Sequence, residues 1–416
     1  MRKSLVFLLT IFVCALGSAT ASAQSSSTTG EASEGSNTNL LSASDLFDQI
    51  SDARRLLSSR PTSGPAPDRV TLAAFDSETS QTIIVSLPKN EFLTKDADFL
   101  TTSEPGRTIR VHVVRANGVN TAVTTTDAST GRSLVPLLVQ FPIVKGGAVT
   151  EMAYYTSAHP ALLSQSITEA GRSYVRKMLD SAAERLAQDG VTVSPDIVDI
   201  AEHLCIVEHT DHKRFMNEDH AVLFPEILSL YALNEGNTFR YSVSTAGAGG
   251  MIQMIPRTYA GIRQQHSGVS LQPDFVSGMR NHANALEAML LYMNDTWNNL
   301  AQSSEVKDAL RDGIATKPEL MAAGYNSNPM RLPLYLKTGG SQWRTLIPAE
   351  TQIYLRIYTS VDNTLEMGSN SVGSARASNR PQAVVAVMKP SNATAVFSWL
   401  SQSLTTGTSL LRLLGN

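Results

Sequence analysis

The feature that most constrains the fold is a change of hydrophobic period near residue 160. Before it, short β-branched runs such as "TIIVSLP", "RTIRVHVV" and "LVPLLVQFPIV" are separated by Gly, Pro, Asn and Asp. Such runs are typical of strands, and Asn117-Gly118 lies where a hairpin turn is expected. After it the period is helical. The sequence therefore predicts an α+β, multidomain chain, with a small β-rich accessory domain over residues 67–160 and a mainly helical domain over residues 161–360.

The start of the chain has the three parts of a secretory signal peptide. Arg2 and Lys3 precede an apolar run, Leu5–Gly17, and small residues follow up to Ala23. The run is too short to span a bilayer with ease, and the small residues form a cleavage site. We therefore expect residues 1–23 to be a signal peptide and the protein to be exported.

Cysteine content and charge limit the compartment and the partners. Cys14 lies in the signal segment, so Cys205 is the only cysteine expected to remain, and it can form no disulfide within the chain. A disulfide-free exported protein fits a bacterial periplasm or cell surface. The net charge of −3 gives no electrostatic reason to expect nucleic acid as a partner. No later stretch is long and apolar enough to predict a transmembrane helix.

The segments outside the two domains have a polar, flexible composition. Residues 24–66 are rich in Ser, Thr, Gly and Asn and predict a linker with room for one short helix near Leu40–Leu57. Residues 361–416 have a similar composition and predict a flexible C-terminal tail.

Two apolar helical stripes in the second domain each end in a glutamate. The stripes are Ile197, Ala201, Leu204 and Glu208, and Phe224, Leu228, Tyr231 and Glu235. Pro195 and Pro225 are expected to begin the two helices, and Gly236 is expected to end the second. Burial and the negative end of a helix dipole both favour the protonated form of a carboxyl, as a general acid near neutral pH requires. An acid at the end of a stripe also occurs where a helix leaves the core, so further signals are needed.

The stretch after Glu235 supplies such a signal. "STAGAGGMIQMIP" contains Ser244, Gly247, Ala248, Gly250, Met251, Ile252, Gln253, Met254 and Pro256 in an order that resembles lytic transglycosylases with a soluble-lytic-transglycosylase-type catalytic domain. "AAGYNSNP" at 322–329 and "IPAETQIYLRIY" at 347–358 resemble two later motifs of this family. Gly236 departs from the serine that usually follows the catalytic glutamate. The resemblance covers about 160 residues and none of the N-terminal half.

The resemblance implies a lysozyme-like fold that cleaves peptidoglycan glycan strands between N-acetylmuramic acid and N-acetylglucosamine. One glutamate acts as acid and then as base, so that an anhydromuramyl end forms without water, and no cofactor is implied. Spacing to the glycine loop favours Glu235 as this acid, with Glu208 as the alternative. By the same resemblance, the substrate-binding residues are Ser244, Gly247, Gln253, Tyr325, Asn326 and Tyr354.

Several alternatives stay open at this stage. The glycines can bring backbone close to a glycan or can let two helices touch. If both Glu208 and Glu235 reach the cleft, the domain would be a water-using muramidase, and without an active acid it would be a peptidoglycan-binding module. The last alternative is a metal site among the potential ligands of this segment, which are His203, Cys205, Glu208, His209, Asp211, His212, Glu218, Asp219 and His220. The His-Glu-x-x-His pattern is absent, so we do not predict a metal.

Overall fold

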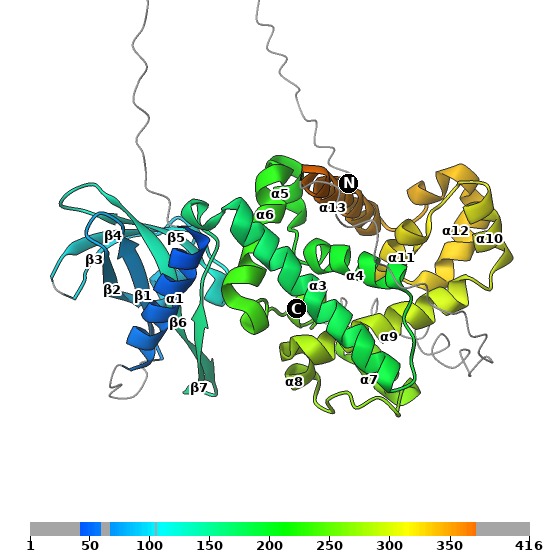
Figure 1. Cartoon of the computed structure of the whole chain (residues 1–416), viewed down its shortest axis with the longest axis horizontal. Coiled ribbons are helices and arrows are strands. Elements are labelled where there is room, and N and C mark those ends of the chain that lie inside the picture. The colour runs from blue at the N-terminus through cyan, green and yellow to red at the C-terminus, as the bar shows by residue number, and fades with distance from the viewer. Residues whose placement is uncertain (1–41, 60–66, 105, 372–416) are drawn as a thin grey trace, which may run out of the picture. The chain divides into compact units, whose positions relative to one another are not determined.

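The computed structural model of the protein describes residues 42–59, 67–104 and 106–371. The expected signal peptide, residues 1–23, lies outside the described residues, as do residues 24–41 and 60–66 of the expected linker and residues 372–416 of the expected tail; residues 361–371 of that tail instead continue helix α13 (Ala349–Ser371). The described residues belong to one compact unit, in which a sheet is followed along the chain by helices (Figure 1). The chain is thus α+β, as the change of period predicts.

Within the described residues, seven strands form one antiparallel sheet in the order β2-β1-β6-β5-β4-β3, with β7 paired to β6. The strands are β1 (Arg69–Asp76), β2 (Gln81–Pro88), β3 (Asp98–Thr102), β4 (Thr108–Arg115), β5 (Ala122–Asp127), β6 (Ser133–Lys145) and β7 (Ala148–Tyr155). All three strand runs quoted from the sequence are confirmed, and the turn at Asn117-Gly118 joins β4 to β5. The sheet curls into a half-barrel, which brings its two end strands, β2 and β3, toward each other. There the Glu104 amide, just after β3, donates to the Ile84 carbonyl of β2 at 3.2 Å.

The sheet has apolar residues on both faces because both are covered. Alternate residues of the strands, such as Val85 in β2 and Val111 in β4, pack with Phe92 of the short helix α2 (Lys89–Phe92) inside the curl. Leu138 of β6 and Phe75 of β1 face the other way. A strand buried on both faces reads as a continuous apolar run rather than an alternating one, which explains the composition of β6.

Helix α1 (Ala43–Ser58) lies in the segment expected to be a linker and covers the outer face of the sheet (Figure 1). Leu46, Ile50, Ala53 and Leu57 recur at helical spacing and are all buried. The Ser42 side chain accepts from the Asp45 amide at 3.1 Å and caps the first turn. The expected short helix is therefore present, and it is a folded part of the compact unit.

The region after the sheet is helical. Its helices are α3 (Gln165–Gln188), α4 (Pro195–Val207), α5 (His212–Asn217), α6 (His220–Asn234), α7 (Pro256–Gln265), α8 (Phe275–Arg280), α9 (His282–Leu300), α10 (Ser304–Arg311), α11 (Lys317–Asn326), α12 (Leu332–Gly339) and α13 (Ala349–Ser371). None of the helices in the described ranges has the length and apolarity needed to cross a bilayer.

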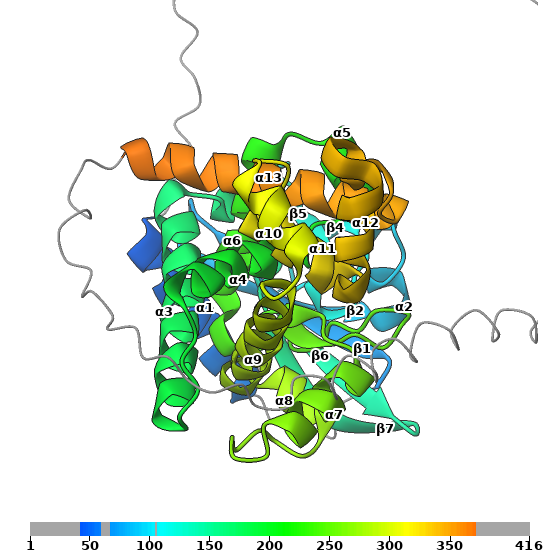
Figure 2. The ribbon, with the colours of Figure 1, turned by 90° about the vertical axis from the view of Figure 1, so that its right-hand side faces the viewer.

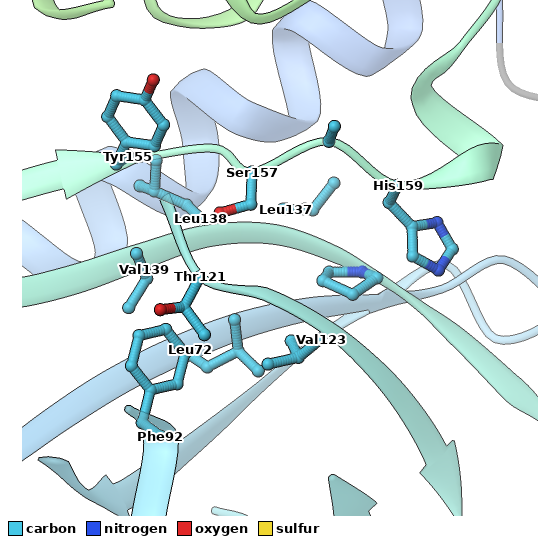
Figure 3. A pocket seen from close by; sticks show the side chains of 12 residues that line it. Leu72, Phe92, Thr121, Val123, Leu137, Leu138, Val139, Tyr155, Ser157 and His159 are labelled. Carbon is cyan, nitrogen blue, oxygen red and sulfur yellow. The ribbon is translucent and has the colours of Figure 1, made fainter. Parts of the chain in front are cut away.

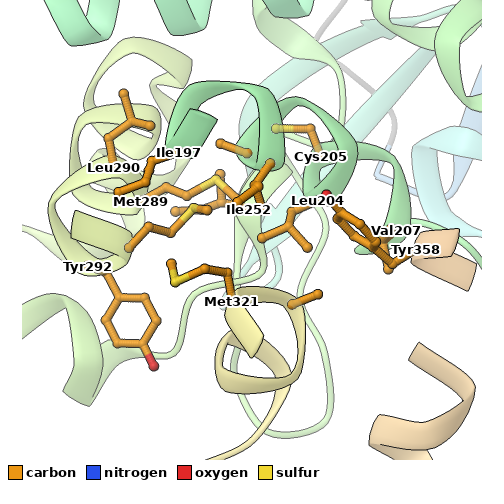
Figure 4. Close-up of a cluster of buried hydrophobic side chains, with 14 of the residues drawn as sticks. Ile197, Leu204, Cys205, Val207, Ile252, Met289, Leu290, Tyr292, Met321 and Tyr358 are labelled. Atoms are coloured by element: carbon orange, nitrogen blue, oxygen red, sulfur yellow. The ribbon is translucent and has the colours of Figure 1, made fainter. Parts of the chain in front are cut away.

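Helix α9 is the central element of the helical region, with other helices around it (Figure 2). Leu286, Met289 and Met293 on α9 are 0% exposed. Cys205 of α4 is buried in the same core, beside Leu204 (Figure 4). Because this core surrounds the C-terminal half of α4, the residue that follows the helix is held beside a rigid apolar wall.

The two helix starts expected at prolines turn out differently. Pro195 is the first residue of α4, as predicted. Pro225 does not begin α6, which starts at His220 and contains the proline in its interior. The Asp219 carboxylate accepts from the Ala221 amide at 2.9 Å and caps the helix before the proline is reached.

The sheet and the helices are joined by polar contacts that depend on buried side chains. The side-chain Nδ2 of Asn234, at the end of α6, donates to the Thr156 carbonyl at 2.8 Å, and its Oδ1 accepts from the Thr156 backbone amide at 2.8 Å. Arg115 of β4 forms an ion pair with Glu226 of α6 at 2.8 Å. These bonds fix the end of α6 against the strand edge.

Candidate functional site

Glu208 follows the last residue of α4 and closes its apolar stripe. Ile197, Ala201 and Leu204 on that stripe are at most 1% exposed, as their spacing predicts. The carboxyl therefore lies beside the core, while part of the residue's surface stays accessible. The Glu208 carboxyl is therefore largely desolvated.

Glu208 is held by a tyrosine from the far end of the sequence. The Tyr354 hydroxyl, on α13, donates to Oε1 of Glu208 at 2.6 Å. Burial raises the pKa of Glu208 to about 8; the bond from Tyr354 acts in the opposite direction, and the nearby Glu350 carboxylate adds to the rise. At neutral pH the Glu208 carboxyl therefore carries a proton that it can donate.

The motifs around 325 and 354 also meet here. The Tyr325 hydroxyl, at the end of α11, donates to the Ile252 carbonyl at 2.7 Å. Burial, with the nearby Glu208 carboxyl, raises the pKa of the Tyr325 hydroxyl far above its usual range. The Asn326 amide oxygen accepts from the Thr351 hydroxyl at 2.8 Å, which ties the end of α11 to the first turn of α13. Tyr325, Asn326 and Ile252 thus lie in one assembly with Glu208.

The glycine loop packs against α8. This contact favours close packing over ligand approach as the reason for its glycines. A Cβ on Gly250, whose φ is +69°, would lie 2.3 Å from the Met279 carbonyl oxygen. A Cβ on Gly249 would touch the side chains of Met279 and Phe275 at 3.6 Å. Gly247 differs, because its φ of +78° needs a glycine while the space beside it is open up to Pro256. Two of the three glycines therefore serve packing, as in the alternative left open above.

The two polar residues of the loop have internal partners. Gln253 has a left-handed backbone, with φ 45° and ψ 40°, and its amide nitrogen donates to the Gly250 carbonyl at 2.8 Å and the Ser242 hydroxyl at 3.2 Å. Ser244 is exposed, and its hydroxyl accepts from the Ala248 amide at 3.0 Å. Gln253 follows Ile252 directly, so it lies at the Tyr325 side of the assembly. Ser244 and Gly247 shape the turn.

Glu235 has a different environment from Glu208. It is exposed, and its carboxyl has neither a hydrogen bond nor an ion pair with any described residue. Helix α6 ends at Asn234, two residues before the Gly236 expected to end it, and Glu235 has a positive φ, with φ 44° and ψ −124°. Such a conformation is strained for a residue with a Cβ. The structure thus does not bring Glu235 into the Glu208–Tyr354 assembly.

The histidines of this segment bind separate partners. His209 donates from Nε2 to the Met251 carbonyl at 3.0 Å, and burial lowers its pKa to about 3, so it is neutral. His220 bonds the Phe215 carbonyl at 2.8 Å, and His203 pairs with Asp362 at 3.1 Å. Across the described residues, no three His, Cys, Asp or Glu side chains are grouped so that they could hold a metal ion.

Two contacts near Glu208 were not predicted from the sequence. Glu350 is exposed and lies four residues before Tyr354 on α13, so both occupy one face of that helix. This spacing within "PAETQIY" is a signal that sequence reasoning could have used. His209 stacks on Phe239 with ring centroids 3.4 Å apart. No local pattern indicates this stack, because the two residues lie on different elements.

A cavity in the sheet region has no contact with this assembly. Leu72, Val123 and His159 are among the residues that line it (Figure 3), and its volume is about 10 Å³. That is room for one water. The Ser157 hydroxyl, which also lines the cavity, has no hydrogen-bond partner among the described residues and would suit such a water. The cavity is too small for a sugar.

The arrangement around Glu208 can transfer a proton to and from a substrate in a partly desolvated place. A protonated carboxyl at neutral pH, a tyrosine that orients it and a loop held beside it are the elements of general acid–base catalysis. No protein-family model, curated protein or solved structure matches the chain.

Proposed function

We propose that the protein is a peptidoglycan lytic transglycosylase with a lysozyme-like helical region, and that Glu208 is its catalytic acid. The observation that carries the proposal is the meeting of separate motif segments at Glu208. Tyr354 bonds its carboxyl, and Tyr325 joins the neighbouring helix to the glycine loop. The proposal replaces Glu235, which spacing favoured, by Glu208.

In the proposed reaction Glu208 acts twice. It gives its proton to the glycosidic oxygen between N-acetylmuramic acid and N-acetylglucosamine as the bond from that oxygen to C1 breaks. The carboxylate then takes the proton of the muramyl C6 hydroxyl while O6 bonds to C1 and closes the anhydro ring. With a pKa of about 8, about nine tenths of Glu208 is protonated at pH 7. Both proton transfers thus use one group, which is regenerated.

Peptidoglycan as the substrate agrees with the export expected from the sequence. We propose a bacterial periplasmic or cell-surface location, from the signal peptide expected over residues 1–23. The curled sheet between that segment and the helices is proposed as an accessory region. Glycan strands are the proposed partner.

A muramidase is the second candidate, and Glu350 favours it. This carboxylate lies near enough to Glu208 to act on its pKa. A second carboxylate beside the acid can position a water, which would then attack C1 in place of the C6 hydroxyl. Reducing muramic ends would be the product.

Digestion of purified murein sacculi, with mass spectrometry of the soluble products, tests the proposal. We expect anhydromuramyl products from the wild type and a loss of about 10²–10⁴-fold in the Glu208→Gln variant, the usual effect of removing a general acid. Glu235→Gln is the matched control and should retain activity within about twofold, because its carboxyl is exposed and unbonded.

The other outcomes separate the alternatives. Reducing ends that disappear in Glu350→Gln would establish the muramidase. A wild type that sediments with sacculi but releases nothing would refute both enzymatic candidates and leave a binding module. Loss of activity in Glu235→Gln but not in Glu208→Gln would overturn the choice of acid.

A further inference from the structure

A second cluster of charged and aromatic side chains lies where the sheet meets the glycine loop. It consists of Glu151 on β7, Arg240 and Tyr241 between α6 and the loop, and Arg280 at the end of α8. We call these four residues the Glu151 cluster. None of them takes part in the acid–base chemistry proposed for Glu208.

Glu151 is the centre of the cluster. Its Oε1 accepts from the Tyr241 hydroxyl at 2.6 Å and lies 3.5 Å from the Arg240 guanidinium, while its Oε2 accepts from Arg280 at 3.2 Å. The two guanidinium carbons lie 5.9 Å and 5.2 Å from the centre of the Tyr241 ring. The ring and the carboxylate thus hold both guanidinium groups in fixed positions.

The cluster has an excess of positive charge that solvent can reach. Two guanidinium groups face one carboxylate, and the side chains of Arg240, Arg280 and Glu151 are 33%, 31% and 30% exposed. Asp274 lies near Arg280 but also near Lys145, so this second pair adds no net charge. The Nε of Arg240 has no acceptor among the described residues, but it is buried from solvent. One positive charge therefore remains for an anion.

Two exposed apolar side chains lie close to the cluster along the chain. Val243 follows Tyr241 by two residues and is 72% exposed, and Val276 precedes Arg280 by one helical turn and is 52% exposed. A peptide offers both methyl groups and carboxylates, whereas an inorganic anion offers no apolar part. The neighbourhood consequently suits an acidic peptide.

The cluster is connected to the candidate active site through one residue. Ser242 follows Tyr241, and its hydroxyl accepts from the Gln253 amide at 3.2 Å, while its carbonyl accepts from the Gly250 amide at 3.1 Å. Gln253 follows Ile252, whose carbonyl is bonded by Tyr325. A ligand that reaches Gln253 would thus have the Glu151 cluster next to it.

We propose that Arg240 and Arg280 bind a carboxylate of the peptide stem that peptidoglycan carries on its muramic acid. This inference rests on the proposed function, because it takes peptidoglycan as the substrate. The glycan would lie toward Glu208, and the stem would leave it toward β7. Glu151 and Tyr241 are positioning residues, since they hold the guanidinium groups rather than contact the substrate.

Binding of a synthetic tetrasaccharide with two peptide stems tests the inference. The ligand is used with its stem carboxylates free and with all of them converted to amides, and Kd is measured calorimetrically for full-length Glu208→Gln protein, which avoids turnover. We expect the free acid to bind about tenfold more tightly, as for one charge-assisted pair of hydrogen bonds. Adding Arg280→Gln should remove this difference.

Arg176→Gln in the same background is the matched control, because the Arg176 side chain is also ion-paired and 34% exposed. It should keep the tenfold difference. Equal Kd values for the two ligands in the parent protein, or an equal loss in Arg176→Gln, would overturn the inference. The ligand comparison in the parent needs no mutation at the cluster, so misfolding of Arg280→Gln cannot hide the answer.

Failure of the inference and failure of the proposed function give different results. If the wild type releases anhydromuramyl products but the parent protein binds both ligands equally, the proposed function stands and the stem subsite is refuted. If the parent protein prefers the free acid but the wild type cleaves nothing, the subsite stands and the enzymatic function is refuted. No binding of either ligand overturns the subsite.

Discussion

Replacing Glu208 by glutamine is expected to stabilise the protein while it removes the proposed activity. The amide of the Glu208→Gln variant would keep an oxygen to accept from the Tyr354 hydroxyl, which now bonds Oε1 of the glutamate at 2.6 Å. It would not carry the charge that burial disfavours. Strained or desolvated groups at active sites commonly lower stability in this way.

The sign and the pH window follow from the direction of the pKa change. The folded protein binds the Glu208 proton more tightly than the unfolded chain, since the pKa rises from an ordinary 4.5 to about 8. The wild type therefore loses free energy of unfolding, relative to the variant, as the pH rises from 4.5 to about 8. Each pH unit is worth about 1.4 kcal/mol. The difference reaches about 3 kcal/mol at pH 7, an upper limit because part of the residue is accessible to water.

Urea unfolding followed by circular dichroism, at half-unit steps from pH 4 to pH 9, measures this difference. The two proteins should have the same free energy of unfolding near pH 4, and the variant should gain steadily up to about pH 8. Glu235→Gln, at an exposed position, is the control for the glutamate-to-glutamine change itself. A gap between wild type and Glu208→Gln that stays constant over the range would refute the desolvation argument.

Two further substitutions probe the loop and the tyrosine. Gly250→Ala should lower the free energy of unfolding by about 3 kcal/mol or more, because its Cβ would lie 2.3 Å from the Met279 carbonyl oxygen. Gly247→Ala meets only the strain of its positive φ and should lower it by about 1 kcal/mol. Urea unfolding of the two variants measures the difference. Tyr354→Phe removes a bond that favours the charged form of Glu208, so the alkaline limb of the pH–kcat profile should move up by about one pH unit. An unmoved limb would contradict the role given to Tyr354.

Local patterns predicted the elements of this fold well where one local signal dominates. The β-branched runs became β2, β4 and β6, and the proline at 195 began α4. Pro225 failed as a start signal because Asp219, which caps α6, is the stronger one. Helix α6 ends at Asn234 rather than at Gly236, and the Asn234 side chain bonds Thr156 across the sheet edge, a contact that no local pattern records.

The acid could not be chosen from the sequence for a related reason. Glu208 and Glu235 both close apolar stripes at helix ends, and spacing to the loop favours Glu235. What separates them is Tyr354, whose bond to Glu208 spans 146 positions of the chain. Sequence reasoning selected Tyr354 by resemblance, but could not say which glutamate it would meet.

The glycine loop shows how close packing and a proposed binding role can depend on the same residues. Gly250 has no side chain because the backbone must pass close to the Met279 carbonyl. That close approach seats the next residues in the core, where Ile252 is 0% exposed, and leaves its carbonyl to accept from Tyr325. Packing and function are therefore linked here. The loop needs small residues to be rigid, and its rigidity would hold Gln253 between the proposed acid and the Glu151 cluster.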